Sequence, residues 1–284
     1  MTLETPASTE WCQRWRDGRA SWRHRFEGGF DRSRYEAAPL SEAEAKAYVL
    51  RNHYSGSYPA AHARYGLWRG DQLVGAAVLA VPVNTAVLTG VFPGLVPMEE
   101  STTLGRFVLD DSVESNGETF FLGRVWRMAA QEGYRGVVSF ADPMPRRDAA
   151  GSLVVPGHFG TIYQAANSSY LGRGTARRLC VLPDGTTLND RSAQKVRRQE
   201  RGHDHVEARL CALGATPLQA GEDPTTWLRQ AQLHVGARWV RHAGNHRYCF
   251  VIGRSRTERR QVALAMAPQP YPKSLDLDAT SAAA

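Results

Sequence analysis

Regular hydrophobic spacing begins after residue 40. Ser41 and Glu44 form a capping box, in which each side chain bonds the free backbone N–H of the other, and this pattern predicts a helix that runs to about Arg51. Two short, strand-like apolar segments follow at residues 64–69 and 73–81. A Gly-Asp dipeptide joins them and favours a tight turn, so this stretch predicts a β-hairpin.

The middle of the chain alternates between strand and helix periods. Residues 104–109 are strand-like, residues 118–131 repeat apolar side chains at helical spacing, and residues 135–140 form a short apolar strand. A strand, helix, strand order connects parallel neighbours, which predicts that two of these strands pair in parallel. Residues 160–171 have helical spacing again, and residues 176–182 predict a further strand.

The C-terminal third has clearly marked helix ends. Asp223 is a helix N-cap residue followed by proline, and Gly236 is placed to end that helix. After Arg260 the chain is rich in Pro, Ala and Ser, which predicts a loose tail. The expected helices span residues 191–201, 204–213 and 224–235, and the expected strands span residues 238–242 and 247–252.

This element order predicts the α/β (α+β) class, with a mixed sheet flanked by helices. In the N-terminal segment Trp11 and Trp15 have helical spacing and Trp22 follows, which favours an amphipathic arm that packs on the main domain or contacts nucleic acid. The expected organisation is an arm at residues 1–39, a core at 40–183, a basic helical insertion at 184–236, strands at 237–260 that complete the core, and a flexible tail at 261–284.

Composition narrows the class of protein further. A chain of 284 residues, 42% of them hydrophobic, can bury the core of one large domain, or a core with an appendage. No stretch approaches the roughly 20 apolar residues that cross a bilayer, and Trp, Arg and Glu stand where a signal peptide is apolar, so we expect a soluble protein that is not exported. Four cysteines are too far apart for a zinc or redox motif and are expected as buried thiols: Cys12, Cys180, Cys211 and Cys249.

Positive charge is concentrated in one part of the chain. Lys and Arg number 35 against 28 Asp and Glu overall, and residues 190–260 alone contain 14 against 7. A local field of one sign attracts polyanions. One face of the expected helix at 191–201 is basic, which indicates contact with a nucleic-acid backbone, with a solvated helix as the alternative. The residues of this basic face are Arg191, Lys195, Arg197, Arg198 and Arg201.

Two candidate binding groups lie near the strand at 104–109. Ser115, Asn116 and Gly117 precede the next helix, whose N-terminus presents free N–H groups and a positive dipole end that would bind a phosphate; an ordinary turn is the alternative. Arg106 has apolar neighbours along its strand. Because an unpaired charge is costly there, it needs an anion, either a structural carboxylate or a ligand group.

Further polar residues follow the strand at 135–140. Ser139 and Asp142 lie at its carboxyl end, where open α/β sheets bind ligands, so Asp142 is a candidate base or orienting group, or else a turn residue. Tyr163 and Asn167, four residues apart on the expected helix, share a face that lines a cleft or meets solvent.

His53 and Tyr54 lie just beyond the first predicted helix. A histidine titrates near neutrality, serves as a general base and ligates metals, and a helix cap is the alternative here. His203 and His205 are two residues apart at the start of a charged helix, and the other histidines show no metal-binding spacing.

The segments R-N-H-Y-S-G, L-G-R-F-V-L-D-D, G-V-V-S-F-A-D-P, H-F-G-T-I-Y-Q-A-A-N and G-N-H-R-Y lie at these element ends. Together, over approximately residues 40–255, they resemble the Mom family of phage DNA-modification proteins. The resemblance implies a GNAT-like fold and an enzyme that converts adenine in DNA to its N6-carbamoylmethyl (acetamido) form, which protects the phage genome from host restriction. It also implies that the protein acts in the cytoplasm of an infected bacterium.

The resemblance implies a set of site residues. Those implied as catalytic are His53, Tyr54, Arg106, Asp142 and Tyr163, and those implied in substrate or cofactor binding are Ser115, Asn116, Gly117, Ser139, Gln164 and Asn167. Acetyl-CoA is the implied donor and double-stranded DNA the implied partner. Iron is a further candidate cofactor, with His53 and Asp142 as its only candidate ligands.

The sequence leaves three functions in competition. Besides the DNA-modifying transferase, an ordinary GNAT N-acetyltransferase would act on a small amine or a protein, and a DNA-binding protein would carry no catalysis. The loop at residues 112–117 lacks the full glycine-rich phosphate pattern of ordinary GNAT enzymes, which leaves the identity of the donor open. The oligomeric state stays open as well, with a dimer as one alternative.

Overall fold

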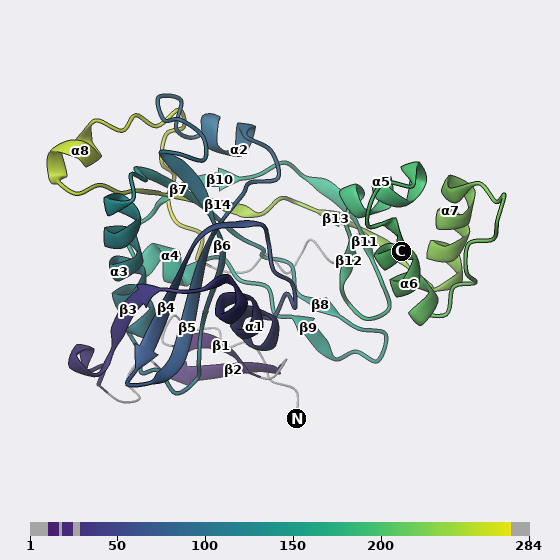
Figure 1. The fold of residues 1–284 in the computed structure, drawn as a ribbon, viewed down its shortest axis with the longest axis horizontal. Coiled ribbons are helices and arrows are strands. Elements are labelled where there is room, and N and C mark those ends of the chain that lie inside the picture. The colour runs from purple at the N-terminus through teal and green to yellow at the C-terminus, as the bar shows by residue number, and fades with distance from the viewer. Residues whose placement is uncertain (1–10, 17–18, 25–28, 274–284) are drawn as a thin grey trace. The chain divides into compact units, whose positions relative to one another are not determined.

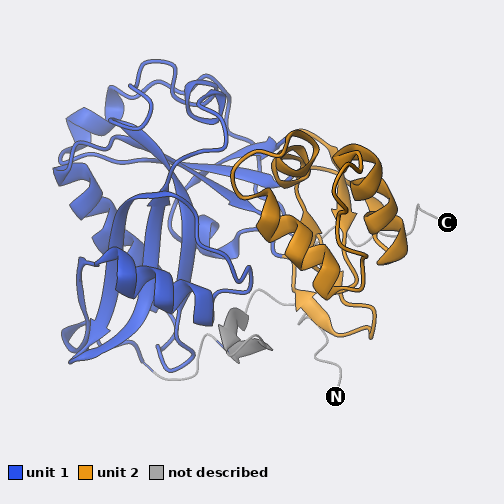
Figure 2. Ribbon diagram, turned by 45° about the vertical axis from the view of Figure 1, so that its right-hand side comes forward, with its two compact units in different colours: residues 1–143, 158–174, 245–275 blue, residues 144–157, 175–244, 276–284 orange. Residues whose placement is uncertain are grey.

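A computed structural model describes residues 11–16, 19–24 and 29–273 of the chain. The chain divides into two compact units (Figure 2). Unit 1 comprises residues 1–143, 158–174 and 245–275, and unit 2 comprises residues 144–157, 175–244 and 276–284. The chain therefore leaves unit 1 and returns to it twice between residues 143 and 245.

Unit 1 contains both helices and strands (Figure 1). Its strands are β1 (Trp11–Arg16), β2 (Arg19–His24), β3 (Glu36–Pro39), β4 (Ala61–Arg69), β5 (Gln72–Ala80), β6 (Ser101–Leu109), β7 (Gly136–Ala141), β10 (Ser169–Arg173) and β14 (His246–Val251). Its helices are η1 (Arg32–Arg34), α1 (Glu42–Asn52), α2 (Ala86–Thr89), α3 (Gly117–Gln131), α4 (Thr161–Ala165) and α8 (Arg256–Arg260).

Seven strands of unit 1 form one mixed sheet, in the order β10-β14-β7-β6-β5-β4-β3. Neighbours run antiparallel except β6 and β7, which pair in parallel across the connection through α3. This confirms the predicted α/β class, the mixed sheet flanked by helices, and the parallel pair. The predicted hairpin is β4 and β5, and Gly70 in its turn has a φ of +57° that favours glycine.

The parallel pair of β6 and β7 is open at one end. Its register runs from Ser101 opposite Gly136 to Leu104 opposite Ser139, and stops there. Both strands continue, but beyond this point β6 pairs only with β5, and β7 only with β14. The facing edges of the two strands are thus unpaired with one another from Gly105 onward.

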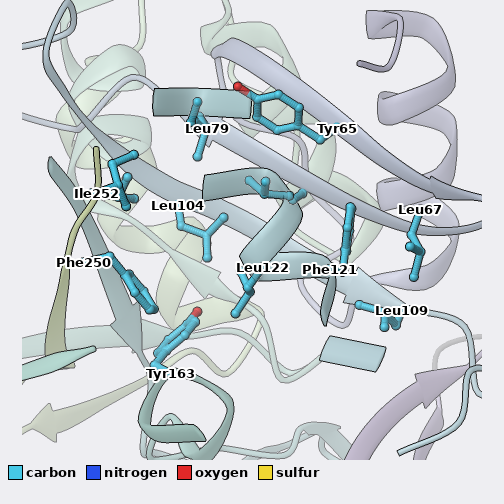
Figure 3. Close-up of a cluster of buried hydrophobic side chains, with 14 of the residues drawn as sticks. Tyr65, Leu67, Leu79, Leu104, Leu109, Phe121, Leu122, Tyr163, Phe250 and Ile252 are labelled. Carbon is cyan, nitrogen blue, oxygen red and sulfur yellow. The ribbon is translucent and has the colours of Figure 1, made fainter. Parts of the chain in front are cut away.

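Two helices cover opposite faces of the sheet. Along β5, Ala77 and Leu79 belong to the larger core under α3, whereas Ala76 and Val78 pack in a second core with α1. This alternation is the period of two that places successive strand residues on opposite faces. The larger core is shown in Figure 3 and includes Tyr65, Leu67, Leu104, Phe121, Leu122, Tyr163 and Phe250.

The ends of α1 and the buried side of α3 agree with the sequence. Ser41 Oγ accepts from the backbone N–H of Glu44, and Glu44 Oε2 accepts from the backbone N–H of Ser41, each at 3.3 Å, which confirms the capping box. On α3 the predicted apolar stripe is buried, with Phe121 and Val125 fully inaccessible. Burial of each large apolar side chain contributes about 1.5–3 kcal/mol to stability.

The N-terminal segment is a hairpin, so the predicted helical spacing is wrong. β1 and β2 pair antiparallel from Trp11 opposite His24 to Arg16 opposite Arg19. A separation of four residues fits the strand period of two as well as the helix period, so the Trp spacing could not distinguish them. The last residues of the predicted arm form β3, an edge strand of the main sheet. Residues 1–10, 17–18 and 25–28 of the arm lie outside the described residues.

Two further expectations for unit 1 are corrected. The helix expected at 160–171 is only the short α4, and the rest becomes β10, because pairing with β14 overrides the local periodicity. The expected flexible tail packs in its first part: the backbone N–H of Ala265 donates to Val91 O at 3.0 Å and that of Gln269 to Tyr170 O at 2.8 Å. Residues 274–284 of the tail lie outside the described part of the chain.

Unit 2 has its own sheet and core. Its elements are β8 (Arg146–Arg147), β9 (Leu153–Val155), β11 (Arg177–Val181), β12 (Thr187–Leu188), α5 (Asp190–Arg198), α6 (His203–Ala212), α7 (Pro224–His234) and β13 (Arg238–His242). The sheet order is β12-β11-β13, so β13 does not complete the main sheet as expected, because it finds its partner in β11. Cys180, Leu210 and Trp227 are buried among the helices.

The described cysteine side chains are free thiols, with Cys180 and Cys249 buried and Cys211 half-buried. No helix in the described part of the chain is long and apolar enough to cross a bilayer.

Candidate active site

His53 and Tyr54 lie where α1 ends. The backbone N–H of His53 donates to Val49 O at 2.9 Å, so His53 is the helix C-cap. Its ring is held by Ser55, whose backbone N–H donates to Nδ1 at 3.1 Å, and it lies 4.2 Å from the Tyr54 ring between centroids. Burial lowers the pKa of His53 well below its usual value, and the charge of Arg106 acts in the same direction. The imidazole is therefore neutral at neutral pH.

Arg106 lies half-buried on β6, beside an irregularity in the register with β5. Its Nε donates to Ser57 O at 2.9 Å, its Nη2 to Ser57 Oγ at 2.7 Å, and its Nη1 to Gly105 O at 2.6 Å. A side chain at Gly105 would not fit, because a Cβ would lie 2.5 Å from that of Ala80. Burial lowers the pKa of the Arg106 guanidinium, but arginine stays protonated in proteins.

The positive charge of Arg106 is met by neutral oxygens. Among the described residues no carboxylate forms an ion pair with it, so the structural carboxylate considered from the sequence is not found. A half-buried charge without a counter-charge is costly unless a ligand supplies one. Arg106 is therefore the part of the site best suited to a negatively charged or strongly polarised ligand oxygen.

His158 joins the site from the segment that precedes α4. Its Nε2 lies 3.3 Å from Tyr54 Oη, and its backbone N–H donates to Asp142 O at 2.7 Å. Burial lowers the pKa of His158, and the charge of Asp142 opposes that shift. His158 was not among the predicted site residues. Its only sequence signal is its place in the H-F-G-T-I-Y segment, close to Tyr163.

Tyr163 lies on α4, which begins after Gly160. Gly160 has a φ of +81°, and a Cβ there would lie 2.6 Å from Cε2 of Tyr248, so this position requires glycine. The Tyr163 ring lies 5.4 Å from the Tyr248 ring and 6.5 Å from that of His158, between centroids. Burial raises the pKa of Tyr163, and its phenol is neutral near pH 7.

The structure thus brings most of the predicted catalytic residues together in unit 1. His53, Tyr54, Arg106, His158 and Tyr163 form one group, called here the Arg106 cluster, linked by the ring and hydrogen-bond contacts above and by the charge of Arg106 acting on His53 and Tyr163. Asp142 reaches the cluster through its carbonyl and its charge on His158. Ser57, which the sequence did not indicate, positions Arg106.

The other predicted binding residues have different surroundings. Ser139 is buried on β7 at the last paired position of the parallel strands, and its Oγ has no hydrogen-bond partner. Gln164 connects α4 to β14 and to the C-terminal segment, because its Nε2 donates to Tyr248 Oη at 3.2 Å and to Pro272 O at 3.1 Å. Asn167 is exposed beyond the end of α4 with a φ of +58°, so it does not share a helix face with Tyr163 as expected.

The loop before α3 is tightly packed. Ser115 is buried, and its Oγ donates to His24 O at 3.1 Å. Asn116 has a φ of +78° and makes no side-chain cap, and a Cβ at Gly117 would lie 2.3 Å from Val113 Cγ1. The loop carries charges of both signs, because Arg34 Nη1 lies 3.1 Å from Glu114 Oε1 and Arg69 donates to Ser112 O at 3.2 Å and to Ser112 Oγ at 2.9 Å.

The predicted basic face lies on α5 of unit 2 and in the turn after it. The helix ends at Arg198, where Gln199 has a φ of +49°, so Arg201 lies outside it. Arg191 is paired, with its Nη2 2.5 Å from Glu200 Oε2. Arg197 and Arg198 are exposed and form no ion pair within the described residues. Arg201 is also exposed without an ion pair among the described residues, so the available cations of the face are Arg197, Arg198 and Arg201.

The described residues do not fit an iron site. No group of three or more His, Cys, Asp and Glu side chains comes together in the described part of the chain. His53 and Asp142 alone supply too few ligands for the facial sites that bind iron.

The fold and this site define a mixed α/β protein with a cationic and aromatic cluster beside an open parallel strand pair. The chain belongs to the Mom protein family, whose sequence profile matches residues 34–273. This confirms the resemblance seen in the sequence. No curated protein sequence matches the chain.

The solved structures to which the chain is similar have low sequence identity to it. A tandem GNAT protein from the clavulanic acid biosynthesis pathway is 12% identical, with a TM-score of 0.34 over 78% of this chain and 75% of that chain. A GNAT family acetyltransferase from Elizabethkingia anophelis with acetyl-CoA bound is 12% identical, with a TM-score of 0.30 over 55% and 93%. A Bacillus subtilis acetyltransferase in complex with CoA is 10% identical, with a TM-score of 0.30 over 77% and 98%.

Proposed function

We propose that the protein is a transferase that converts adenine in double-stranded DNA to N6-carbamoylmethyl (acetamido)adenine. The product would protect phage DNA from host restriction enzymes in the cytoplasm of an infected bacterium. The observation that carries the proposal is the match to the Mom family across residues 34–273. The gathering of His53, Tyr54, Arg106 and Tyr163 from distant parts of the chain into one cluster supports it.

An acetyl-CoA donor, implied by the family resemblance, would supply an activated two-carbon group. Arg106 would suit its acyl end, because it offers a fixed positive charge to an oxygen that gains negative charge. The unpaired edges of β6 and β7 offer backbone groups to an extended chain between them. The loop before α3 leads into a helix N-terminus, so Ser115, Asn116 and Gly117 remain the candidates for contact with the diphosphate of the donor.

The target base has to leave the duplex, because adenine N6 is paired inside it. In a transfer from a thioester, N6 would bond to the donor's two-carbon group as the carbon–sulfur bond breaks, coenzyme A would leave as the thiol, and N6 would lose a proton to a neutral base. The carbamoylmethyl product would further need an amine as nitrogen donor and a two-electron oxidant for the methyl carbon, and the proposal assigns neither to a residue of this chain. His158 is neutral, and its Nε2 would accept the N6 proton directly or through the Tyr54 hydroxyl 3.3 Å away. The charge of Asp142 favours the protonated imidazole that results.

The DNA backbone is assigned to the basic face of α5. Arg197 and Arg198 are exposed and unpaired within the described residues, and phosphate contacts of this kind weaken steeply as salt rises. They position the polymer and carry no sequence information by themselves.

Mass spectrometry tests the chemistry. Nucleosides are prepared from the DNA of bacteria that express the protein, its Arg106→Ala variant, or an Arg254→Ala control whose charge lies outside the cluster, beside Glu258. We expect an adenosine of altered mass with the wild type and the control, and none with Arg106→Ala. Unaltered adenosine in cells that contain folded wild-type protein would contradict the proposal. An acetylated small amine or protein in those cells would instead identify an ordinary acetyltransferase.

A further inference from the structure

A second basic surface lies on the three-stranded sheet of unit 2. Where β11 pairs with β13, Arg178 is directly opposite Arg241, and Cys180 is opposite Trp239. Residues opposite one another in an antiparallel pair, and residues two apart along a strand, share a face of the sheet. Arg178, Trp239 and Arg241 therefore share one face, and all three are exposed.

The helices cover this face at Cys180 and leave it open at Trp239, the partner of Cys180 on the edge strand β13. Cys180 is buried and accepts a hydrogen bond from Nε2 of Gln232 on α7, so the helices cover the sheet there. Trp239 is 42% exposed and is not among the residues that pack in the core of unit 2. Its indole leaves a large aromatic surface in solvent, which a ligand would cover.

The two arginines have no counter-charge within the described residues. Arg178 and Arg241 place like charges directly opposite one another, which destabilises a strand pair. The Arg178 guanidinium carbon lies instead 5.6 Å from the centroid of the Trp239 ring. Residues 144–157 and 175–244 contain 13 Arg and Lys against 8 Asp and Glu, so the surroundings of this face are also positive. An anion bound between the arginines would relieve the repulsion.

We propose that Arg178, Trp239 and Arg241 bind a DNA strand, with an unstacked base on the indole and neighbouring phosphates on the two guanidinium groups. An aromatic platform flanked by cations is the combination that binds single-stranded nucleic acid. A regular duplex has no free base face, so this surface prefers DNA that is locally opened, as extrusion of an adenine requires. An acidic protein segment would pair with the arginines and leave the exposed part of the indole in solvent. The inference rests on the proposed function only in taking DNA as the polymer.

Fluorescence anisotropy with labelled single-stranded and duplex oligonucleotides, and the full chain, tests the surface. Trp239→Ala is expected to weaken single-strand binding by about tenfold, and Trp239→Phe to keep most of the affinity, because a phenyl ring still stacks. The double variant Arg178→Ala/Arg241→Ala is expected to reduce the slope of log K against log salt on the single strand by about 1.4, or about 0.7 for each phosphate contact. These exposed arginines can be replaced even where loss of the indole disturbs the fold.

Arg229→Ala is the matched control, because Arg229 is exposed on α7 and its replacement removes one positive charge, as each of the two arginine replacements does. Unchanged single-strand affinity in the arginine double variant and in Trp239→Ala would overturn the surface. So would an equal loss with Arg229→Ala, since total charge would then explain the binding. Nucleoside mass spectrometry keeps the two proposals apart: modified adenine with unaffected variants rejects the surface alone, whereas weakened variants without modified adenine reject the proposed function alone.

Discussion

Tyr54 Oη lies 3.3 Å from Nε2 of His158, although 104 residues separate them in the chain. Tyr54 follows the end of α1, and His158 is held by its backbone N–H to Asp142, just after β7. The contact thus joins the end of a helix to the carboxyl end of a strand in the parallel pair. It places a hydroxyl against an imidazole that burial keeps neutral, which is an arrangement suited to proton transfer.

Tyr54→Phe is expected to lower the rate of adenine modification by about 100-fold, the usual size of a lost proton-transfer group. Tyr58→Phe is the matched control, because Tyr58 lies in the same segment of chain but packs against the second core beside α1, outside the Arg106 cluster. Modified adenosine in cellular DNA, quantified at equal protein levels, gives the comparison. Equal activity of the two variants would remove Tyr54 from the proton path.

Arg106→Lys is expected to be as inactive as Arg106→Ala, with a loss of about 100- to 1,000-fold. A lysine ammonium cannot reproduce the planar fork that spans Ser57 O, Ser57 Oγ and Gly105 O. Ser57→Ala removes only the contact with Oγ and is expected to cost far less, since the Ser57 carbonyl remains. A fully active Arg106→Lys enzyme would show that charge alone suffices at this position.

The sequence predicted much of the cluster because the residues lie at element ends that carry recognisable segments. It did not predict Ser57, whose carbonyl holds Arg106 and is a group that every residue has. It did not predict His158, because a single histidine in a connecting segment carries no spacing signal; only the fold brings it to Tyr54.

The same limit explains the errors in the fold. Residues 169–171 continue the helical spacing of the segment before them, but they pair with β14, about 80 residues away, and this pairing decides their structure. The sequence predicts β13 in the main sheet, because nothing in the local pattern distinguishes its true partner, β11, from another strand. Elements with strong local signals, such as α1 with its capping box and α7 with Asp223 and Pro224, were predicted within a residue or two.

Stability is expected to fall as the pH drops below the usual histidine value of 6.5. Burial lowers the pKa of both His53 and His158 in the folded protein. As the pH falls, these histidines therefore bind protons at a higher pH in the unfolded chain than in the folded protein, and this proton binding stabilises the unfolded state. Their contribution is complete above pH 6.5 and is lost below it, at no more than about 1.4 kcal/mol per pH unit for each histidine. Urea unfolding at several pH values measures the slope, which is expected to flatten in His53→Gln/His158→Gln. An unchanged slope would contradict the assignment.

Gly160→Ala is expected to reduce both stability and activity. A non-glycine residue at a φ of +81° costs about 1–2 kcal/mol, and the crowding against Tyr248 adds about 1–3 kcal/mol. Gly133→Ala separates the two causes, because Gly133 also has a positive φ, +104°, but has no atom within 4 Å of an added Cβ. Denaturant unfolding should show the larger loss for Gly160→Ala. Equal losses would mean that Tyr248 moves aside without cost.

The arginines of α5 are expected to contribute unequally to the binding of duplex DNA. Arg191 already has a partner in Glu200 at 2.5 Å, whereas Arg197 and Arg198 are exposed without an ion pair among the described residues. Both arginines lie in the last turn of α5, where a cation also stabilises the helix by about 0.3–1 kcal/mol, so thermal melting has to accompany each binding measurement. Arg197→Ala/Arg198→Ala should reduce the slope of log K against log salt by about 1.8, at about 0.9 for each phosphate contact.

Arg191→Ala provides the comparison within the same helix. It removes one charge that Glu200 largely neutralises, and it should change the salt slope by much less than half of the double variant. Electrophoretic shift of a duplex at increasing salt measures both variants beside the wild type. Wild-type binding that persists at several hundred millimolar salt would mean that α5 does not hold the phosphate backbone. An Arg191→Ala effect as large as that of the double variant would mean the same, because the exposed unpaired arginines would then contribute no more to binding than a paired one.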